Sequence, residues 1–329
     1  MLLLNRDDIK SVLSMRDAIQ AAKDALRIFS QGKGIVPLRT NINVSKFEGQ
    51  CLFMPGYIEE MGSAGIKISS VFPKNIEKGL PSVPSKMVLI SGETGEVRAI
   101  MDGTYLTQLR TGGVAGAATE ILSRKDAKVG ALFGGGGQGA AQLEAMLTVR
   151  KLELVKIFDI NLERAKEFAA KMREELSSFA AEIIAVDSSE TAIENADVIT
   201  TATTSKKPVF DGRKVKRGAH INALGSYTPQ MQEIDDEIMK RADKIYLDSK
   251  EAVLSEAGDL IIPIAKGTIS TNDITGELGD VIAGLLPGRE RDDEIIIFDS
   301  VGIAILDIVA SQMIYKKALD LGFGIPIDF

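Results

Sequence analysis

The stretch Leu132-Phe133-Gly134-Gly135-Gly136-Gly137-Gln138-Gly139 decides the fold of this chain. Gly134, Gly136 and Gly139 have the spacing G-x-G-x-x-G, in which one glycine closes a tight turn, one lets the backbone approach a pyrophosphate and one lets a helix pack on a strand. An apolar strand-like run precedes these glycines at 129–133, and a helix-like run follows them at 140–146. A flexible glycine-rich linker is the alternative, but linkers are not bracketed in this way. The stretch therefore predicts a dinucleotide-binding turn.

A carboxylate stands where such a turn needs one. Asp159 lies 20 residues after Gly139, at the end of the next apolar run, Val155-Lys156-Ile157-Phe158. An acidic side chain at this place accepts hydrogen bonds from the adenosine ribose and repels a 2′-phosphate. No arginine follows Asp159 at once, and Arg164 already belongs to the next predicted helix. We therefore predict NAD, rather than NADP, as the cofactor.

Strand-like and helix-like runs alternate from about residue 120 to residue 299. The longest helical pattern covers 162–176. The predicted strands are 129–133, 154–158, 182–186, 197–202, 219–224, 244–247 and 294–298. Such alternation is typical of a doubly wound parallel sheet, so the predicted fold class is α/β with a Rossmann-type domain at 119–299.

The first part of the chain has a different pattern. Its first 30 residues predict two helices, the second capped by Ser14, and short strands follow at 40–44, 65–71 and 87–90. This pattern predicts an antiparallel α+β domain over residues 1–118. The apolar helix that begins at 300 has no place on the parallel sheet, so we expect the segment 300–329 to return to the first domain.

Composition excludes several classes of protein. The net charge is −7 and no basic face is evident, which argues against nucleic acid as a partner. A single cysteine, Cys51, cannot form an internal disulfide and indicates a reducing compartment. The N-terminus lacks the basic region of a signal peptide, and no apolar run is long enough for a bilayer, so we expect a soluble cytoplasmic protein. His220 is the only histidine, so we expect no metal site and a structural role for this ring.

Arg110 is the second informative residue. It lies on the apolar stripe of a helix predicted to begin near Thr104. A buried arginine cannot lose its proton and therefore needs an anion. That anion is either an internal Asp or Glu or the carboxylate of a substrate. Arg39, at the start of a strand, and Lys67, within another strand on the face opposite Ile66, are two further cations that suggest a substrate carboxylate.

The chain resembles the ornithine cyclodeaminase/mu-crystallin family. The matching stretches cover nearly the whole chain in the family's order. They are Pro37-Leu38-Arg39, Gly65-Ile66-Lys67, Gly79-Leu80-Pro81-Ser82-Val83, Glu93-Thr94-Gly95-Glu96, Met101-Asp102-Gly103, Leu109-Arg110-Thr111-Gly112, the Gly134–Gly139 turn with Gln138, His220-Ile221-Asn222-Ala223-Leu224-Gly225 and Phe298-Asp299-Ser300-Val301-Gly302-Ile303-Ala304.

This resemblance implies a substrate-binding and dimerisation domain, a Rossmann domain and a homodimer built through the first domain's sheet. It implies that Arg39, Lys67 and Arg110 grip the carboxylate of a small amino-acid or imino-acid substrate beside the nicotinamide. It also implies contacts with the cofactor outside the glycine-rich turn and Asp159. The full set of expected cofactor-binding residues is Ser82, Thr111, Gly134, Gly136, Gln138, Gly139, Asp159, Thr201, Thr203, Leu224 and Ser300.

One departure from the family bears on the reaction. Cyclodeaminases of the family carry an acid/base aspartate directly after the glycine of the Asn-Ala-x-Gly stretch, and here Ser226 holds that position. The catalytic residues that we expect are Lys67, Arg110 and Ser226. A serine without a base does not shuttle protons as a carboxylate does. We therefore expect reduction of a cyclic ketimine or of an oxo acid plus an amine. The alternatives are an ornithine cyclodeaminase, which is a lyase, and a non-catalytic binder of NADPH and a small ligand.

Overall fold

The computed structural model describes residues 1–328 and divides into two compact units. Unit 1 consists of Met1–Arg110 and the segment from Ile303 onward, and unit 2 is Thr111–Gly302. The expected boundaries were 118 and 300. The first division falls inside helix α3 (Gly103–Leu122), so the chain passes between the units within one continuous helix. Phe329, the last residue of the expected segment 300–329, lies outside the described residues.

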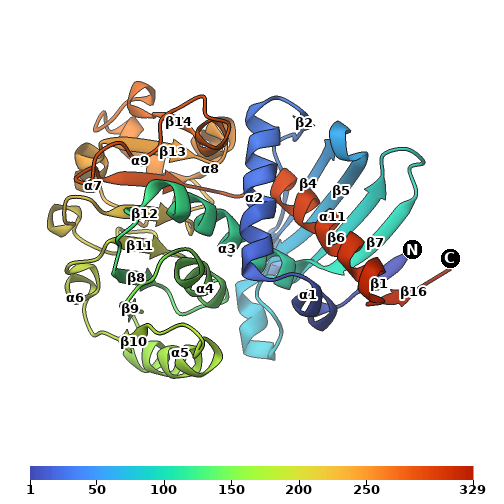
Figure 1. Ribbon diagram of the computed structural model, residues 1–329, viewed down its shortest axis with the longest axis horizontal. Helices are drawn as coiled ribbons and strands as arrows, with labels where there is room; N and C mark the ends of the chain where they lie inside the picture. Colours follow the sequence, from blue (N-terminus) through green and yellow to red (C-terminus); the bar gives the residue numbers. More distant parts are fainter. Residues whose placement is uncertain (329) are drawn as a thin grey trace. The chain divides into compact units, whose positions relative to one another are not determined.

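Unit 1 is built on a mostly antiparallel sheet. Its strands run in the order β16-β1-β7-β6-β5-β4-β2, with β3 also paired to β4, and β1 lies parallel to β7. Their bounds are β1 Leu2–Leu4, β2 Gly34–Ile35, β3 Thr40–Val44, β4 Gly49–Ile58, β5 Ser63–Val71, β6 Ser85–Ser91, β7 Val97–Asp102 and β16 Ile325–Pro326. Because β16 pairs with β1, the two ends of the chain lie side by side, as Figure 1 shows.

Three helices accompany this sheet: α1 (Arg6–Val12), α2 (Met15–Ser30) and α11 (Ala304–Leu321). Ser14 caps α2 as predicted, since its side chain accepts from the N–H of Asp17 and the Asp17 carboxylate accepts from the N–H of Ser14. The predicted return of the C-terminal helix is also seen, because α11 packs on α2, β4 and β5 (Figure 1). Gly56 permits this close packing, since a Cβ there would meet the Ile308 side chain at 2.8 Å.

Strand β5 separates two faces of the sheet by alternation. Ser63, Gly65, Lys67 and Ser69 are buried, whereas Ile68 is 38% exposed on the opposite face. The sequence prediction that Lys67 lies opposite Ile66 and Ile68 is therefore confirmed.

Unit 2 contains the predicted parallel sheet. Its strands run in the order β10-β9-β8-β11-β12-β15-β13-β14, and neighbouring strands are parallel. The strand bounds are β8 Val129–Phe133, β9 Leu154–Phe158, β10 Glu182–Ala185, β11 Val198–Thr201, β12 His220–Ala223, β13 Lys244–Leu247, β14 Gly276–Glu277 and β15 Ile296–Asp299. The order reverses at β8, and ligands of such sheets bind beyond the carboxyl ends of the strands at this switch point.

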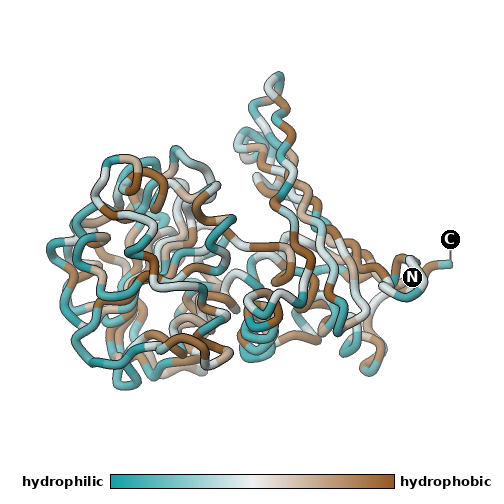
Figure 2. Tube along the Cα trace, turned by 90° about the horizontal axis from the view of Figure 1, so that it is seen from above, coloured by the Kyte–Doolittle hydropathy of each residue, from teal (hydrophilic) through white to brown (hydrophobic). Residues whose placement is uncertain are grey.

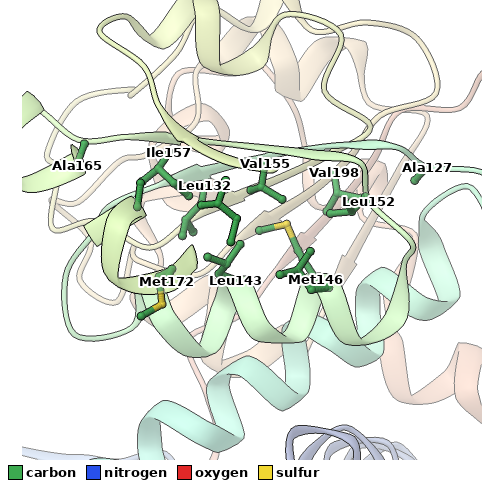
Figure 3. Close-up of a cluster of buried hydrophobic side chains, with 13 residues drawn as sticks. Ala127, Leu132, Leu143, Met146, Leu152, Val155, Ile157, Ala165, Met172 and Val198 are labelled. Carbon is green, nitrogen blue, oxygen red and sulfur yellow. The ribbon is translucent and has the colours of Figure 1, made fainter. Parts of the chain in front are cut away.

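Helices connect these strands. They are α4 Gly139–Val149, α5 Leu162–Glu175, α6 Ser189–Ile193, α7 Asp236–Arg241, α8 Lys250–Glu256, α9 Gly258–Ala265 and α10 Leu278–Ile282. Figure 3 shows the hydrophobic cluster between α4, α5 and the strands, in which Leu143 and Met146 meet Leu132 and Val155. In Figure 2 the hydrophilic residues of this unit lie mainly along its outer helices and turns. Across residues 1–328, no helix has the length and apolar character that crossing a bilayer requires.

His220 and Asn222, both on β12, together link this strand to β15 and β11 in the middle of the sheet. The imidazole is fully buried, with Nδ1 3.2 Å from the carbonyl oxygen of Ile296 and Nε2 3.0 Å from Oδ1 of Asn222. The Asn222 amide donates in turn to the hydroxyls of Thr119 and Thr200. Burial, with the nearby Arg289 guanidinium, lowers the pKa of His220 to about 3. The ring is therefore neutral and structural, as the sequence predicts.

This pKa makes the protein sensitive to acid. In the unfolded chain His220 takes up a proton near its ordinary pKa of 6.5, whereas the folded chain excludes that proton until about pH 3. Because the unfolded state binds the extra proton in this window, the free energy of unfolding falls as pH falls, by about 1.4 kcal/mol per pH unit from this group. We expect His220→Gln to remove that component. Urea denaturation of both proteins from pH 7 to pH 4 measures it, and parallel curves would contradict the prediction.

Candidate active site

The three motif glycines of unit 2 occupy three different environments. Gly134 has φ +102°, and a Cβ there would meet the Ala202 carbonyl oxygen at 2.8 Å. A Cβ on Gly139 would meet the Gly134 carbonyl oxygen at 2.7 Å, so this glycine allows α4 to begin close against the turn. A Cβ on Gly136 would meet nothing within 4 Å. The turn is thus open on the side of Gly136, and the contact of this glycine with a pyrophosphate stays a prediction.

The N-terminus of α4 is suited to an anion. Among the described side chains, none caps this helix, and Gln138 occupies the cap position without a capping hydrogen bond. The first N–H groups of a helix have no partner within the helix, and its dipole makes this end partially positive. The turn and the helix start together could therefore hold the pyrophosphate of a dinucleotide.

Asp159 directly follows β9, and its carboxylate is almost completely buried. It accepts from the N–H groups of Gly135 and Asn161, at 3.1 and 3.0 Å. Arg164, in the first turn of α5, reaches back and donates from both Nε and Nη2, with Nε 3.0 Å from Oδ2. Burial alone would raise the pKa of Asp159, but Arg164 and the two N–H groups outweigh it and hold the pKa below its usual value.

Other predicted cofactor residues lie at the same edge of this sheet. Thr201 and Leu224 stand at the carboxyl ends of β11 and β12, and Thr203 and Ser300 follow β11 and β15. The Thr201 hydroxyl and the Thr203 N–H both donate to the Glu233 carboxylate, at 2.7 and 2.6 Å. Ser82 and Thr111 lie in the loop before β6 and in α3, and their cofactor contacts stay predictions.

Buried carboxyl groups gather at this edge. Glu233 also accepts from the Gly225 N–H at 2.7 Å, and burial raises its pKa. Burial and the negative charge of Glu233 raise the pKa of Asp259 to about 8. Asp299 is fully buried, its pKa is raised well above the usual value by burial and by the charges of Asp259 and Asp248, and its two oxygens have no hydrogen-bond partner among the described residues. The surroundings of Asp299 therefore favour its protonated form.

Ser226 is engaged in the structure of its loop. Its hydroxyl donates to the carbonyl oxygen of Met231 at 2.8 Å and accepts from the N–H of Asp259 at 3.3 Å. The side chain is buried. These contacts use the hydroxyl proton to hold the segment after β12, and a catalytic role for Ser226 stays a prediction.

Unit 1 holds a group of cations around one carboxylate. Lys67, on β5, and Arg110, on α3, are both buried, and both reach Asp307 on α11. The Lys67 Nζ lies 2.9 Å from each oxygen of Asp307, and the Arg110 Nε lies 3.0 Å from Oδ1. Of the two anions expected for Arg110, an internal carboxylate or that of a substrate, the structure contains the internal one, Asp307.

The charges of this group do not cancel. Burial and the positive charges of Arg110 and Arg39 together lower the pKa of the Lys67 ammonium to about 7, although the charge and hydrogen bond of Asp307 act in the opposite direction. Arg39, on the segment before β3, is thus close enough to act on Lys67. Lys67 and Arg110 share the single carboxylate of Asp307, which leaves a positive surplus at these two cations that a second anion would balance.

The sequence prediction missed three residues of these sites. Asp307 is the only charge in the apolar run 301–310, so the argument applied to Arg110 would have found it. The sequence places Arg164 in a predicted helix and gives no sign that, from the first turn of α5, its side chain returns to Asp159. Glu233 had no signal, since its role depends on the folding of its loop beneath two strand ends.

Comparison with known proteins agrees with this fold. The model of the ornithine cyclodeaminase/mu-crystallin family matches residues 1–322, and the chain belongs to this family. A Delta(1)-pyrroline-2-carboxylate reductase of Bacillus cereus is 36% identical over 329 residues, which is 100% of both chains. An alanine dehydrogenase of Archaeoglobus fulgidus is 38% identical over 328 residues, 100% of this chain and 98% of the relative.

A solved structure is also similar to the whole chain. It is that of Thermococcus litoralis Delta(1)-pyrroline-2-carboxylate reductase in complex with NADH and L-proline. The TM-score is 0.95 at 40% sequence identity, and the match covers 99% of this chain and 100% of that chain.

Proposed function

We propose that this protein is an NAD-dependent oxidoreductase that reduces a small cyclic ketimine of the pyrroline-2-carboxylate type. The observation that carries the proposal is the positive surplus around Lys67 and Arg110, in a chain that also carries a dinucleotide turn. The Bacillus cereus and Thermococcus litoralis reductases, similar over their whole length, support the same substrate class.

The cofactor is held by unit 2. The turn from Gly134 to Gly139 and the start of α4 bind the pyrophosphate, and Asp159 binds the adenosine ribose. The polar groups that follow β11, β12 and β15 receive the nicotinamide end, and Ser82 and Thr111 add contacts that the family resemblance implies. When bound, a reduced nicotinamide supplies the hydride.

The substrate carboxylate is held by Arg39, Lys67 and Arg110. A planar guanidinium can grip a carboxylate with two parallel hydrogen bonds, which fixes the orientation as well as the position of the imino acid. The carbon of the C=N bond is then held in the near-attack geometry that hydride transfer needs. A protonated imine is already electrophilic, so this step requires little acid/base catalysis from the protein.

The contacts of Ser226 favour reduction over cyclisation. Ornithine cyclodeamination needs a group that moves protons between amines, and the Ser226 hydroxyl already donates to the Met231 carbonyl oxygen. The second candidate reaction is reductive amination of an oxo acid such as pyruvate with ammonia, which the Archaeoglobus fulgidus relative supports. It uses the same hydride transfer to an imine carbon.

We further propose a homodimer formed through the face of the unit 1 sheet opposite α11. Ile42 and Ile68 are 52% and 38% exposed on this face, where β3, β4 and β5 pair side by side. Exposed apolar side chains of this kind mark interaction surfaces. An archaeal alanine dehydrogenase dimer with 38% identity and a TM-score of 0.91 supports the assembly. The single cysteine supports the cytoplasm as the compartment.

The substrate is tested by a panel of reactions. We expect NADH oxidation with pyrroline-2-carboxylate, weaker oxidation with pyruvate plus ammonia, and little or no ammonia release from ornithine. Absorbance at the NADH band and an ammonia assay measure these. Efficient proline formation from ornithine would contradict the proposed reaction, and tight NADH binding without turnover on any imine would indicate a binding protein.

Cofactor choice is tested at Asp159. We expect the wild type to prefer NADH in kcat/KM, because the carboxylate repels a 2′-phosphate. Asp159→Ser should narrow the preference by roughly tenfold or more, since like-charge juxtaposition costs several kcal/mol. The double variant Asp159→Ser with Arg164→Gln is the matched control. It should narrow the preference less, because Arg164 is then absent as a phosphate partner. Wild-type activity with NADPH equal to that with NADH would contradict the assignment.

The dimer is tested by charge on its proposed interface. Ile68→Asp places a carboxylate in the centre of the exposed apolar face, and we expect it to convert a dimer into a monomer. Light scattering after size-exclusion chromatography measures the mass. Leu285→Asp, at an exposed apolar residue of unit 2, is the control and should leave the mass unchanged. A monomeric wild type, or a dimeric Ile68→Asp, would contradict this interface.

A further inference from the structure

Asp307 is placed to organise the cations of unit 1. It lies near the start of α11, is fully buried and is the one carboxylate among the described residues that both Lys67 and Arg110 reach. The two cations come from different elements, β5 and α3. A single side chain thus fixes the relative positions of two charged groups that are far apart in the sequence.

The contacts of Asp307 differ between its two partners. Lys67 lies against both carboxylate oxygens, whereas the hydrogen bond of Arg110 is made by its Nε–H. A guanidinium carries four further N–H groups on its Nη atoms. Contact through Nε leaves these four donors for other acceptors. The two Nη atoms can then bind a second carboxylate at two points.

A single buried carboxylate is also the negative charge best suited to a site that binds a substrate carboxylate. Without Asp307, two buried cations would face each other beside Arg39, which would favour loss of the Lys67 proton. With a second buried acid, the charges of Lys67 and Arg110 would be balanced and a substrate carboxylate would gain little. Asp307 therefore offsets part of the charge and leaves the rest for a ligand.

We propose that Asp307 is a positioning residue: its carboxylate holds Lys67 and Arg110 in the places from which both can bind the carboxylate of the substrate. This inference rests on the proposed function and extends it to a residue on the C-terminal helix. Asp307 acts through the two cations and does not touch the substrate.

The pH dependence of ligand binding follows from this arrangement. The charged groups that face Lys67 are Asp307 from α11, Arg110 from α3 and Arg39 from the segment before β3. With the pKa of Lys67 at about 7, carboxylate binding weakens above neutral pH as the ammonium loses its proton. Asp307 is the group that opposes this loss, so its removal moves the weakening to lower pH.

Binding of pyrrole-2-carboxylate to the protein with NADH present provides the test. This planar analogue has a carboxylate but no ring nitrogen that titrates near neutrality, and its binding is measured by NADH fluorescence between pH 5.5 and 9. Asp307→Asn keeps the size of the side chain and removes the charge. Ser63→Ala is the matched control, because it removes the buried hydrogen bond of 2.9 Å between Ser63 on β5 and Gln312 on α11 without touching the cations.

For Asp307→Asn we expect affinity at pH 7 to fall about tenfold and the alkaline weakening to begin about one pH unit lower, since a neighbouring opposite charge moves a pKa by about one to three units. Ser63→Ala should bind as the wild type does at every pH. Asp307→Glu, which keeps the charge but adds a methylene group, should bind more weakly with an unchanged pH dependence. It also provides the test if Asp307→Asn does not fold.

Three outcomes would overturn the inference. The first is that Asp307→Asn binds the analogue with the affinity and pH dependence of the wild type. The second is that Asp307→Glu binds it with the affinity of the wild type. The third is that Ser63→Ala shows the same pH shift as Asp307→Asn. Turnover of pyrroline-2-carboxylate by the wild type is measured in parallel. Absence of this turnover would contradict the proposed function. Normal turnover by the wild type, together with unchanged binding of the analogue by Asp307→Asn, would contradict only the role of Asp307.

Discussion

The burial of Lys67 and Arg110 is the constraint on which unit 1 depends. Two cations removed from water require a carboxylate at hydrogen-bond distance, and the strands of the sheet provide none on that face. Asp307 comes from α11, so the C-terminal helix must pack directly on β4 and β5. That packing requires small residues beneath it, and Gly56 meets this need. The electrostatics of the site and the course of the chain are thus two aspects of one requirement.

The two units differ in the sign of most charged groups that they bury at the candidate sites. The turn from Gly134 to Gly139 presents neutral backbone N–H groups and a helix dipole, and the carboxyl ends of its strands gather acids such as Glu233 and Asp259. Those acids are satisfied by backbone and hydroxyl donors or hold a proton. Unit 1 instead places two buried cations, Lys67 and Arg110, on one carboxylate. A large diphosphate can be bound by many weak donors, whereas a single carboxylate on a small molecule needs a few strong ones.

The predictability of this molecule from its sequence differs between local and distant contacts. The parallel strands match the predicted runs closely, because buried strands are continuous apolar segments with turn residues between them. Strands of two or three residues, such as β2 and β16, carry no periodicity and were not predicted. Arg110 was found because a charge on an apolar stripe is unusual. Its pairing with Asp307 was not, because no local pattern joins residues separated by almost two hundred positions.

The return of α11 also sets the order in which the protein can mature during synthesis. All of unit 2 has left the ribosome once Gly302 has emerged, and its core is then complete. All strands of unit 1 except β16 are made before unit 2, yet the face that carries Lys67 acquires α11 only after unit 2 has been made. During synthesis, the sheet face that carries Lys67 therefore lacks α11 until all of unit 2 has been made. The N-terminal part of the chain is thus exposed longest to aggregation and to chaperones.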